Sequence, residues 1–458
     1  MILLLKNCLI PWTVSFLMLC ISGLGVNYGD IDLTQQSKDA LIAVNGVDTA
    51  LSQNINVNRP YQDNFTYSQK GYRDGELLFL PKPSGGYPVG TTSYYFTDPK
   101  REEIYTEEPD DRRELMVRVW YPSKQVLEVK HAPYFSQSLG VEDSLGAIAT
   151  NSIVNAPVAR TQSNYPVLLF SHGFASLPEF NTINAEELAS QGYVVVTINH
   201  TYESSVSVFP DGRVITTSQF FNSVIKEQLE SLNKNLNKNS NENLYNSETL
   251  EIFKQSVEVR AKDAQFVLDK LKEINGKNPS GLLTGKLDLD RVGMFGHSLG
   301  GATAAQTLLQ DKRFKAGIDL DGGLFINGVD ESLNQPFMFM NSEVMGTSNT
   351  LEPEVEDLIK LRKSFFQNLQ SDGYDVTIRG TGHYYFSDIP LVLKKLKDAG
   401  LPLGRLGELE NLIDIYNPNP INPERATQII NDYIVAFFDR YLKNQESSLV
   451  NTFVKIKA

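Results

Sequence analysis

The chain contains very little cysteine. Only two of its 458 residues are cysteine, Cys8 and Cys20, and both lie in the apolar N-terminal segment. If that segment is removed, no thiol is left, which excludes disulfides, thiol catalysis and cysteine-ligated metals. Stability must then come from the core, and 41% apolar with 10% aromatic residues suffice for a large one.

Positive charge and histidine are also scarce. The 42 Lys and Arg residues are outnumbered by 55 Asp and Glu, a formal net charge of -13, which argues against a nucleic-acid partner because phosphate binding needs clustered cations. The five histidines are scattered, without the H-E-x-x-H pattern of a zinc hydrolase, and DLDGG at 319–323 lacks the spacing of an EF-hand. We therefore expect no metal and no cofactor.

The N-terminal segment 1–25 has one charge, Lys6, and no other before Asp30. This layout, ending in small residues, predicts a signal peptide and a secreted or periplasmic protein after cleavage. Retention as a membrane anchor is the alternative, because the apolar stretch approaches spanning length. Lipidation at Cys20 is disfavoured, since Leu19 stands where a lipoprotein signal has a small residue.

The rest of the chain divides into a polar N-terminal extension, 26–85, and a main domain, 86–458. In the domain, short β-rich runs alternate with helical segments such as 184–192 and 302–313, which predicts an α/β fold with a mainly parallel sheet covered by helices on both faces. The predicted strands include TSYYF, ELMVRVWYP, YPVLLFS, YVVVTINH, RVGMFGH, FKAGIDL, PFMFMNS and YDVTIRG.

Two regions interrupt this alternation. An insertion at about 220–260 contains the Asn/Lys-rich tract NKNLNKNSNENLYNS, which is low in apolar residues and predicts a surface loop. A second region, about 389–420, has leucines at helical spacing, which favours core-facing helices and leaves a lid or a lipid-facing segment as the alternative.

Ser298 lies in MFGHSLGGATAAQ, a G-x-S-x-G match between an apolar run and a run of small helix-forming residues. The match alone is weak, because chains of this length carry it by chance. A serine hydroxyl becomes a good nucleophile only beside a base, usually a histidine oriented by a carboxylate. In the strand–turn–helix arrangement of a nucleophile elbow, the acid and then the histidine follow the serine along the chain.

His383 is the only histidine after Ser298, so it is the predicted base. It follows a predicted strand, in the loop IRGTGHYYFSD. Asp321 is the preferred acid because it ends the strand AGIDL at the carboxyl rim of the sheet. Asp319 is a possible hydrogen-bonding neighbour, and Glu343, at the tip of PFMFMNSE, is the alternative acid.

The tetrahedral intermediate of ester hydrolysis needs N–H donors for its oxyanion. In this arrangement one donor is the residue after the nucleophile, Leu299, and the other comes from a loop after an early strand. VLLFSHGFAS offers that loop, with the N–H of Phe174 as the predicted donor. His172 and His297 are interpreted as structural. Together these features predict a serine hydrolase of the α/β-hydrolase fold; a catalytically inactive member of that fold, acting as a binding protein, is the non-enzymatic alternative.

With these residues identified, the chain resembles the plasma-type platelet-activating factor acetylhydrolase family, also called lipoprotein-associated phospholipase A2, and especially its secreted bacterial members. The resemblance covers most of the chain after residue 86, including YPVGTTSYYFTDPKRE, YPVLLFSHGF, ELASQGYVVVTINH, GHSLGGATAAQTLLQDKRFKAGIDLDGG and IRGTGHYYFSD. It implies Ser298 as nucleophile, Asp321 as acid, His383 as base, and Leu299 and Phe174 as oxyanion donors.

The resemblance further implies calcium-independent hydrolysis of phospholipids with a short or oxidised sn-2 acyl chain, at a lipid surface. A general secreted carboxylesterase, lipase or polyester hydrolase is the alternative. Gly322 and Gly323 follow the acid where mammalian members carry bulkier residues, so the acyl pocket is expected to differ in shape.

Overall fold

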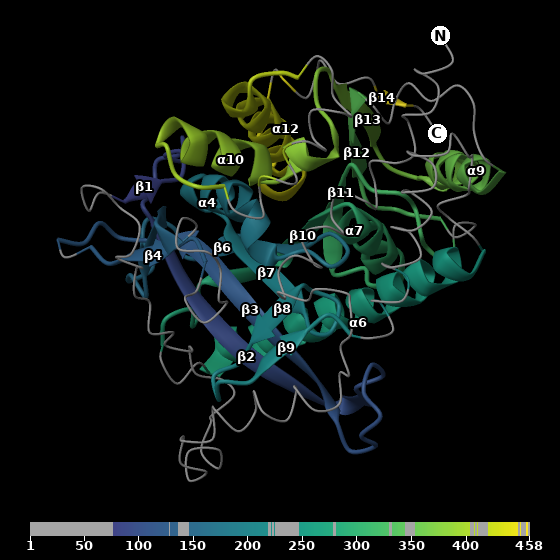
Figure 1. The fold of residues 1–458 in the computed structure, drawn as a ribbon, viewed down its shortest axis with the longest axis horizontal. Coiled ribbons are helices and arrows are strands. Elements are labelled where there is room, and N and C mark those ends of the chain that lie inside the picture. The colour runs from purple at the N-terminus through teal and green to yellow at the C-terminus, as the bar shows by residue number, and fades with distance from the viewer. Residues whose placement is uncertain are drawn as a thin grey trace.

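A long, mostly parallel sheet organises the protein in the computed structural model (Figure 1). The structure describes residues 77–127, 129–135, 146–218, 221, 224, 247–277, 281–328, 332–343, 353–403, 407, 410, 420–447, 449 and 455–456. In this part of the chain the main sheet has twelve strands, in the order β1-β5-β2-β3-β7-β6-β10-β11-β12-β13-β14, with β4 beside β5, and a separate hairpin joins β8 and β9. The strands are β1 (Leu78–Phe79), β2 (Val89–Glu102), β3 (Arg112–Pro122), β4 (His131–Pro133), β5 (Ile148–Val154), β6 (Tyr165–Ser171), β7 (Val194–His200), β8 (Val206–Val208), β9 (Val214–Thr216), β10 (Leu287–His297), β11 (Phe314–Leu320), β12 (Phe337–Ser342), β13 (Gly373–Ile378) and β14 (Lys455–Ile456).

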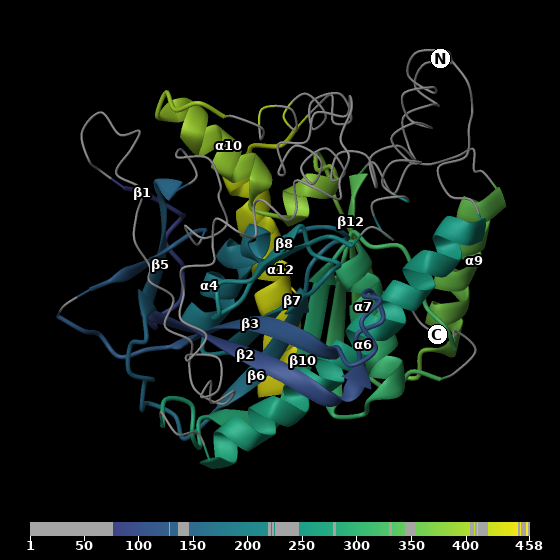
Figure 2. The same cartoon turned by 60° about the horizontal axis from the view of Figure 1, so that its bottom comes forward.

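The centre of the sheet is parallel. Strands β7, β6, β10, β11, β12 and β13 pair in parallel, and β6, β7 and β12 are buried along their whole length. Such strands have apolar side chains on both faces because helices cover both faces. The long strands β2 and β3 instead pair antiparallel and lie side by side in both views (Figures 1 and 2). Over much of their length, buried positions alternate with partly exposed ones.

Helices form a layer on each face. On one face α6 and α7 pack against the sheet and each other, and the rings of Phe365 and Phe366 in α9 contact Phe339 of β12. On the other face α4 and α12 bury Leu188, Ile434 and neighbouring apolar residues. The helices are η3 (Pro178–Asn181), α4 (Thr182–Ser190), α6 (Ser247–Lys277), α7 (Leu299–Gln310), α9 (Pro353–Asn368), η4 (His383–Phe386), α10 (Ile389–Asp398) and α12 (Pro423–Lys443).

The predicted α/β architecture and its main strands are confirmed. The sheet, however, begins at Leu78, within the range predicted as an extension. The sequence analysis did not predict β1 because this strand pairs with β5 over only two residues, which is too short for a recognisable strand pattern. The N-terminal segment 1–25 and the Asn/Lys-rich tract lie outside the described residues. The insertion at about 220–260 ends in α6, whose inner face is part of the core.

Helix α10 tests part of the second irregular region. Its apolar residues Ile389, Leu391, Val392 and Leu396 are buried, so this helix faces the core, as the leucine spacing favoured. Most of the remainder, up to residue 420, is outside the described residues. Within the part of the chain that is described, no helix combines the length and apolarity needed to cross a membrane.

Candidate active site

Ser298 occupies a sharp turn between β10 and α7. Its backbone has φ 58° and ψ -123°, a strained conformation for a residue with a side chain. The turn is held by two bonds: the N–H of Ser298 donates to Leu320 O at 2.9 Å, and the N–H of Gly301 donates to Ser298 O at 2.8 Å. This is the geometry of a nucleophile elbow, which lifts a serine above the carboxyl end of the sheet.

The elbow leaves no room for side chains at two flanking glycines. A Cβ on Gly296 would lie 2.1 Å from Gly300 O, and a Cβ on Gly300 would lie 1.9 Å from Ser171 O. Both contacts are with backbone, which cannot rotate away. The G-x-S-x-G spacing therefore follows from the close approach of β10, α7 and the end of β6.

We expect Gly300→Ala to destabilise the protein by about 3 kcal/mol, because the new methyl group must displace backbone in a packed region. Gly276→Ala, with nothing within 4 Å of its Cβ in α6, is the matched control and should be neutral or slightly stabilising. Denaturant unfolding of both variants measures the difference. Equal stabilities would contradict this account of the elbow.

Asp321 and His383 form a buried pair. The Nδ1 of His383 is 2.8 Å from Oδ2 of Asp321, and the two side chains are 3% and 0% exposed. The other carboxylate oxygen, Oδ1, accepts the N–H of Ser342 at 2.6 Å. Asp321 itself lies in a turn with φ 56°, held by its N–H donating to Met340 O. The carboxylate is thus fixed from two strands, β11 and β12, and accepts the Nδ1 proton of the imidazole.

Glu343, the alternative acid of the sequence analysis, forms hydrogen bonds with the loop that carries His383. Oε2 of Glu343 accepts the N–H of Gly380 at 2.8 Å, and the N–H of Glu343 donates to Thr381 O. His297 contacts the same loop, since its Nε2 lies 3.1 Å from His383 O. Burial holds the pKa of His297 well below its usual value, so this ring is neutral. Glu343 and His297 therefore serve as supports for the loop.

Asp319, two residues before Asp321, holds the turn after β11. Its Oδ1 accepts the N–H of Gly322 at 2.7 Å, while its Oδ2 is buried without a hydrogen-bond partner among the described residues. Burial raises the pKa of Asp319 to about 8. The carboxyl is therefore protonated at neutral pH, which agrees with its interpretation as a hydrogen-bonding neighbour.

We expect Asp319→Asn to become progressively more stable than the wild type as the pH rises from 4 to 8. The native carboxyl keeps its proton until the pH approaches 8, while the unfolded one loses it above about pH 4, so wild-type stability falls by up to about 1.4 kcal/mol per pH unit from this group, on the order of 5 kcal/mol in all. Asparagine does not titrate and can still accept from Gly322. Urea unfolding at pH 5 and pH 8 measures the difference; a constant difference would mean that Asp319 is ionised in the native state.

The loop after β6 lies directly against the elbow. A Cβ on Gly173 would be 3.4 Å from Ser298 Cβ. The loop is bent by Ala175, whose φ is 49°, and closed by the N–H of Ser176, which donates to Gly173 O. In the described part of the chain no backbone carbonyl accepts the N–H of Phe174 or of Leu299. Leu299 follows Ser298 directly, and Gly173, the residue before Phe174, lies beside it, so both predicted donors belong to segments next to Ser298.

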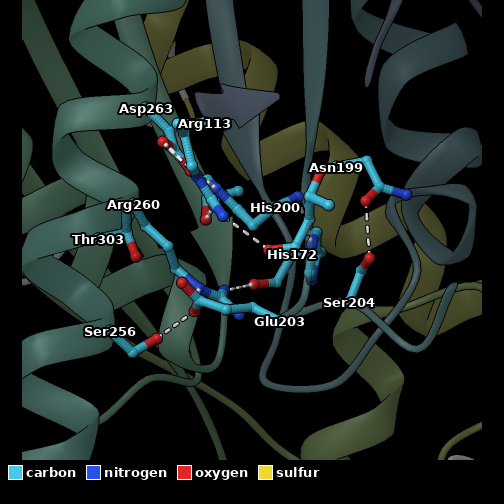
Figure 3. A network of polar contacts seen from close by, with 12 residues as sticks. Arg113, His172, Asn199, His200, Glu203, Ser204, Ser256, Arg260, Asp263 and Thr303 are labelled. Atoms are coloured by element: carbon cyan, nitrogen blue, oxygen red, sulfur yellow. Dashed lines mark hydrogen bonds and ion pairs between the residues drawn. The ribbon is translucent and has the colours of Figure 1, made fainter. Parts of the chain in front are cut away.

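A buried ionic network behind this loop was not predicted from the sequence. It joins Arg113 of β3, His200 at the end of β7, and Arg260 and Asp263 of α6 to the loop (Figure 3). His172, which the sequence analysis interpreted as structural, is part of this network, and its Nδ1 lies 2.7 Å from Gly173 O. The sequence contains one feature that could have indicated this network: Arg260 and Asp263 are three residues apart in α6, so both lie on the helix face that is otherwise apolar.

No group of three or more His, Cys, Asp or Glu side chains suited to a metal ion occurs among the described residues. The chemistry that the site can supply from its own groups is acid–base and nucleophilic.

The fold and the site define a class. A mostly parallel sheet with a serine elbow, a carboxylate–histidine pair and a donor loop at one end describes an ester hydrolase of the α/β-hydrolase fold. A solved structure agrees with this class: a ferulic acid esterase from Streptomyces cinnamoneus superposes with a TM-score of 0.63 at 27% identity, covering 82% of this chain and 99% of the esterase.

The chain belongs to the family described as platelet-activating factor acetylhydrolase, isoform II, whose model matches residues 76–453. Among similar curated proteins is the platelet-activating factor acetylhydrolase of Cavia porcellus, 27% identical over 387 residues, which cover 79% of this chain and 78% of the relative. Another is a probable 1-alkyl-2-acetylglycerophosphocholine esterase of Arthroderma benhamiae, 26% identical over 401 residues, covering 81% and 90%. The predicted family is confirmed.

Proposed function

We propose that Ser298 is the nucleophile, His383 the general base and Asp321 the acid of this ester hydrolase, with the N–H groups of Phe174 and Leu299 as the oxyanion hole. The observation that carries the proposal is the 2.8 Å contact between His383 Nδ1 and Asp321 Oδ2 at the end of the sheet that bears the elbow. Asp321 keeps the proton on Nδ1, which leaves the Nε2 lone pair to accept the proton of the serine.

The reaction then runs in two halves. His383 takes the proton from Ser298 Oγ as the oxygen attacks the ester carbonyl, and the N–H groups of Phe174 and Leu299 stabilise the negative carbonyl oxygen. The alkoxide leaving group departs with the proton from His383, which yields the alcohol and an acyl-enzyme. Water, deprotonated by His383, attacks the acyl-enzyme in the second half and releases the carboxylic acid and the free serine.

For the substrate we propose phospholipids with a short or oxidised sn-2 acyl chain, hydrolysed at or near a lipid surface. The family match and the names of the relatives, which include acetylhydrolases of platelet-activating factor and a 1-alkyl-2-acetylglycerophosphocholine esterase, support this substrate class. The proposed steps use protein groups alone, so calcium is not required.

A general carboxylesterase is the second candidate. The likeness to a ferulic acid esterase, which extends over 99% of that chain, favours it. Gly322 and Gly323 follow Asp321 directly and carry no side chains, so the space for the acyl group next to the acid is expected to differ from that of the mammalian relatives.

The substrate is tested with phosphatidylcholines that carry acetyl, oxidised short or palmitoyl groups at sn-2, assayed in EDTA. We expect hydrolysis of the acetyl and oxidised lipids, little of the palmitoyl lipid, and no activity in Ser298→Ala. Hydrolysis of simple nitrophenyl esters with none of these lipids cleaved would favour the carboxylesterase.

We also propose that the protein acts outside the cytoplasm after removal of residues 1–25, because this segment has the layout of a signal peptide. N-terminal sequencing of the protein recovered from its native host tests the proposal. An intact N-terminus in the membrane fraction would favour the anchor instead.

A further inference from the structure

The protein contains a second serine–histidine–aspartate arrangement. Ser171 Oγ lies 2.9 Å from His200 Nε2, and His200 Nδ1 lies 2.8 Å from Asp263 Oδ2. The contact between His200 Nδ1 and Asp263 Oδ2 uses the same atoms and the same distance as the contact between His383 and Asp321. Figure 3 shows His200 and Asp263 within the wider network around His172 and Arg260.

This arrangement is closed to solvent. Ser171, His200 and Asp263 are all 0% exposed, so no ester can reach the serine. Burial lowers the pKa of His200 to about 4 in spite of its bond to Asp263. The ring is therefore neutral, Nδ1–H donates to the carboxylate, and Nε2 accepts the proton of the Ser171 hydroxyl. The chain of bonds has one direction, from Ser171 to Asp263.

Asp263, the last acceptor in this series of hydrogen bonds, is held in place by two arginines. Arg113 donates two bonds to it, at 2.6 and 3.1 Å, and Arg101 pairs with its Oδ1 at 2.8 Å. Although burial alone would raise the pKa of Asp263, these two arginines hold it well below its usual range. The Asp263 carboxylate is thus ionised, and it is bound to β2 through Arg101 and to β3 through Arg113.

Ser171 is the last residue of β6, and the loop that it begins contains Phe174, the proposed oxyanion donor. The next residue is held as well: Arg260 donates to His172 O at 2.6 Å, and the His200 N–H donates to His172 Nε2 at 3.3 Å. Arg260 is fixed in turn by Glu203 at 2.6 Å. Side chains from β7 and α6 therefore hold the start of the loop on two consecutive residues.

We propose that Ser171, His200 and Asp263 are positioning residues that align the oxyanion loop with Ser298, so that the Phe174 N–H meets the negative oxygen of the tetrahedral intermediate. The inference rests on the proposed function of Ser298 and Phe174. Misplacing a donor weakens the interaction made in the transition state more than the one made with bound substrate. Loss of the Ser171 hydroxyl should therefore lower kcat and leave KM nearly unchanged.

The test compares Ser171→Ala with Ser152→Ala. Ser152 is also fully buried and also donates its hydroxyl to a buried side chain, Glu186, but it lies on β5, outside this network. We expect similar small losses in thermal stability for both variants. Only Ser171→Ala should lower kcat for a nitrophenyl ester, by roughly 10- to 100-fold.

A pair of inhibitors reports on the oxyanion hole itself. A short-chain trifluoromethyl ketone adds to Ser298 and forms an oxyanion, whereas the corresponding alcohol binds without one. In Ser171→Ala we expect the Ki of the ketone to rise by the same factor as kcat falls, with the Ki of the alcohol unchanged. Unchanged kcat and ketone affinity, or equal losses for ketone and alcohol, would overturn the inference. A wild-type protein insensitive to the ketone would instead overturn the proposed function.

If Ser171→Ala does not fold, two substitutions of His200 give the same test. His200→Gln retains an acceptor within reach of Ser171, whereas His200→Asn retains a group beside Asp263 but withdraws from Ser171. We expect kcat to be lower in the Asn variant than in the Gln variant. Equal kcat values in these two variants would contradict a role for the Ser171 bond.

Discussion

Replacing Ser298 with alanine should lower kcat for a short-chain ester by about 10⁵- to 10⁶-fold while the protein stays folded. The hydroxyl is the group that forms the acyl-enzyme, and no other group at the site can replace it. The elbow is held by backbone bonds of Ser298, which alanine keeps, so the free energy of unfolding should change by less than about 0.5 kcal/mol. Steady-state kinetics and urea unfolding measure the two quantities.

The control for this prediction is Ser163→Ala, at an exposed serine in the turn before β6. Its activity and stability should match the wild type. Near-normal turnover in Ser298→Ala would remove the nucleophile from the proposal, whatever the behaviour of the control.

Replacing Asp321 with asparagine should lower kcat by about 10⁴-fold. The Asn Oδ1 can still accept the N–H of Ser342, but its Nδ2 donates to His383 Nδ1. The imidazole then carries its proton on Nε2 and cannot accept one from Ser298. The same nitrophenyl assay measures the loss, and the purified variant should bind the alcohol inhibitor like the wild type.

Two matched substitutions separate Asp321 from the other carboxyl groups. Asp319→Asn makes the same chemical change two residues earlier on β11, and Glu343→Gln alters the alternative acid, which bonds Gly380. Both should keep kcat within about tenfold of the wild type. A 10⁴-fold loss in Glu343→Gln together with a small loss in Asp321→Asn would transfer the role of the acid to Glu343.

Much of the fold could be predicted because its strands are buried on both faces. Continuous apolar runs such as VVVTINH and FMFMNS are confirmed as β7 and β12, and the alternating run ELMVRVWYP is confirmed as part of β3. Strand β1 was missed because its partner, β5, rather than its own two residues, determines its conformation. A sequence pattern has no information about a pairing this short.

The site residues that could be predicted have local signatures. Glycines around Ser298 mark the elbow, and the position of His383 after a strand marks the histidine loop. The structure brings Asp321 and His383 into contact, and the roles of all three residues stay predictions until they are tested. What the sequence could not show is the support behind them. The bonds from Arg113 and His200 to Asp263 join residues 150 and 63 positions apart, and such contacts follow from the packing of α6 on the sheet.

The most direct test of the account is to locate the covalent adduct of a fluorophosphonate ester, which reacts with activated serines. Peptide mass spectrometry of the full protein should place one adduct per chain on Ser298, none on Ser171, and none in Ser298→Ala. Among the described residues, both the proposed nucleophile and Ser171 are associated with a histidine–aspartate pair, but Ser298 is 9% exposed whereas Ser171 is 0% exposed. An adduct on another serine that abolishes ester hydrolysis while Ser298 remains unmodified would contradict the central claim.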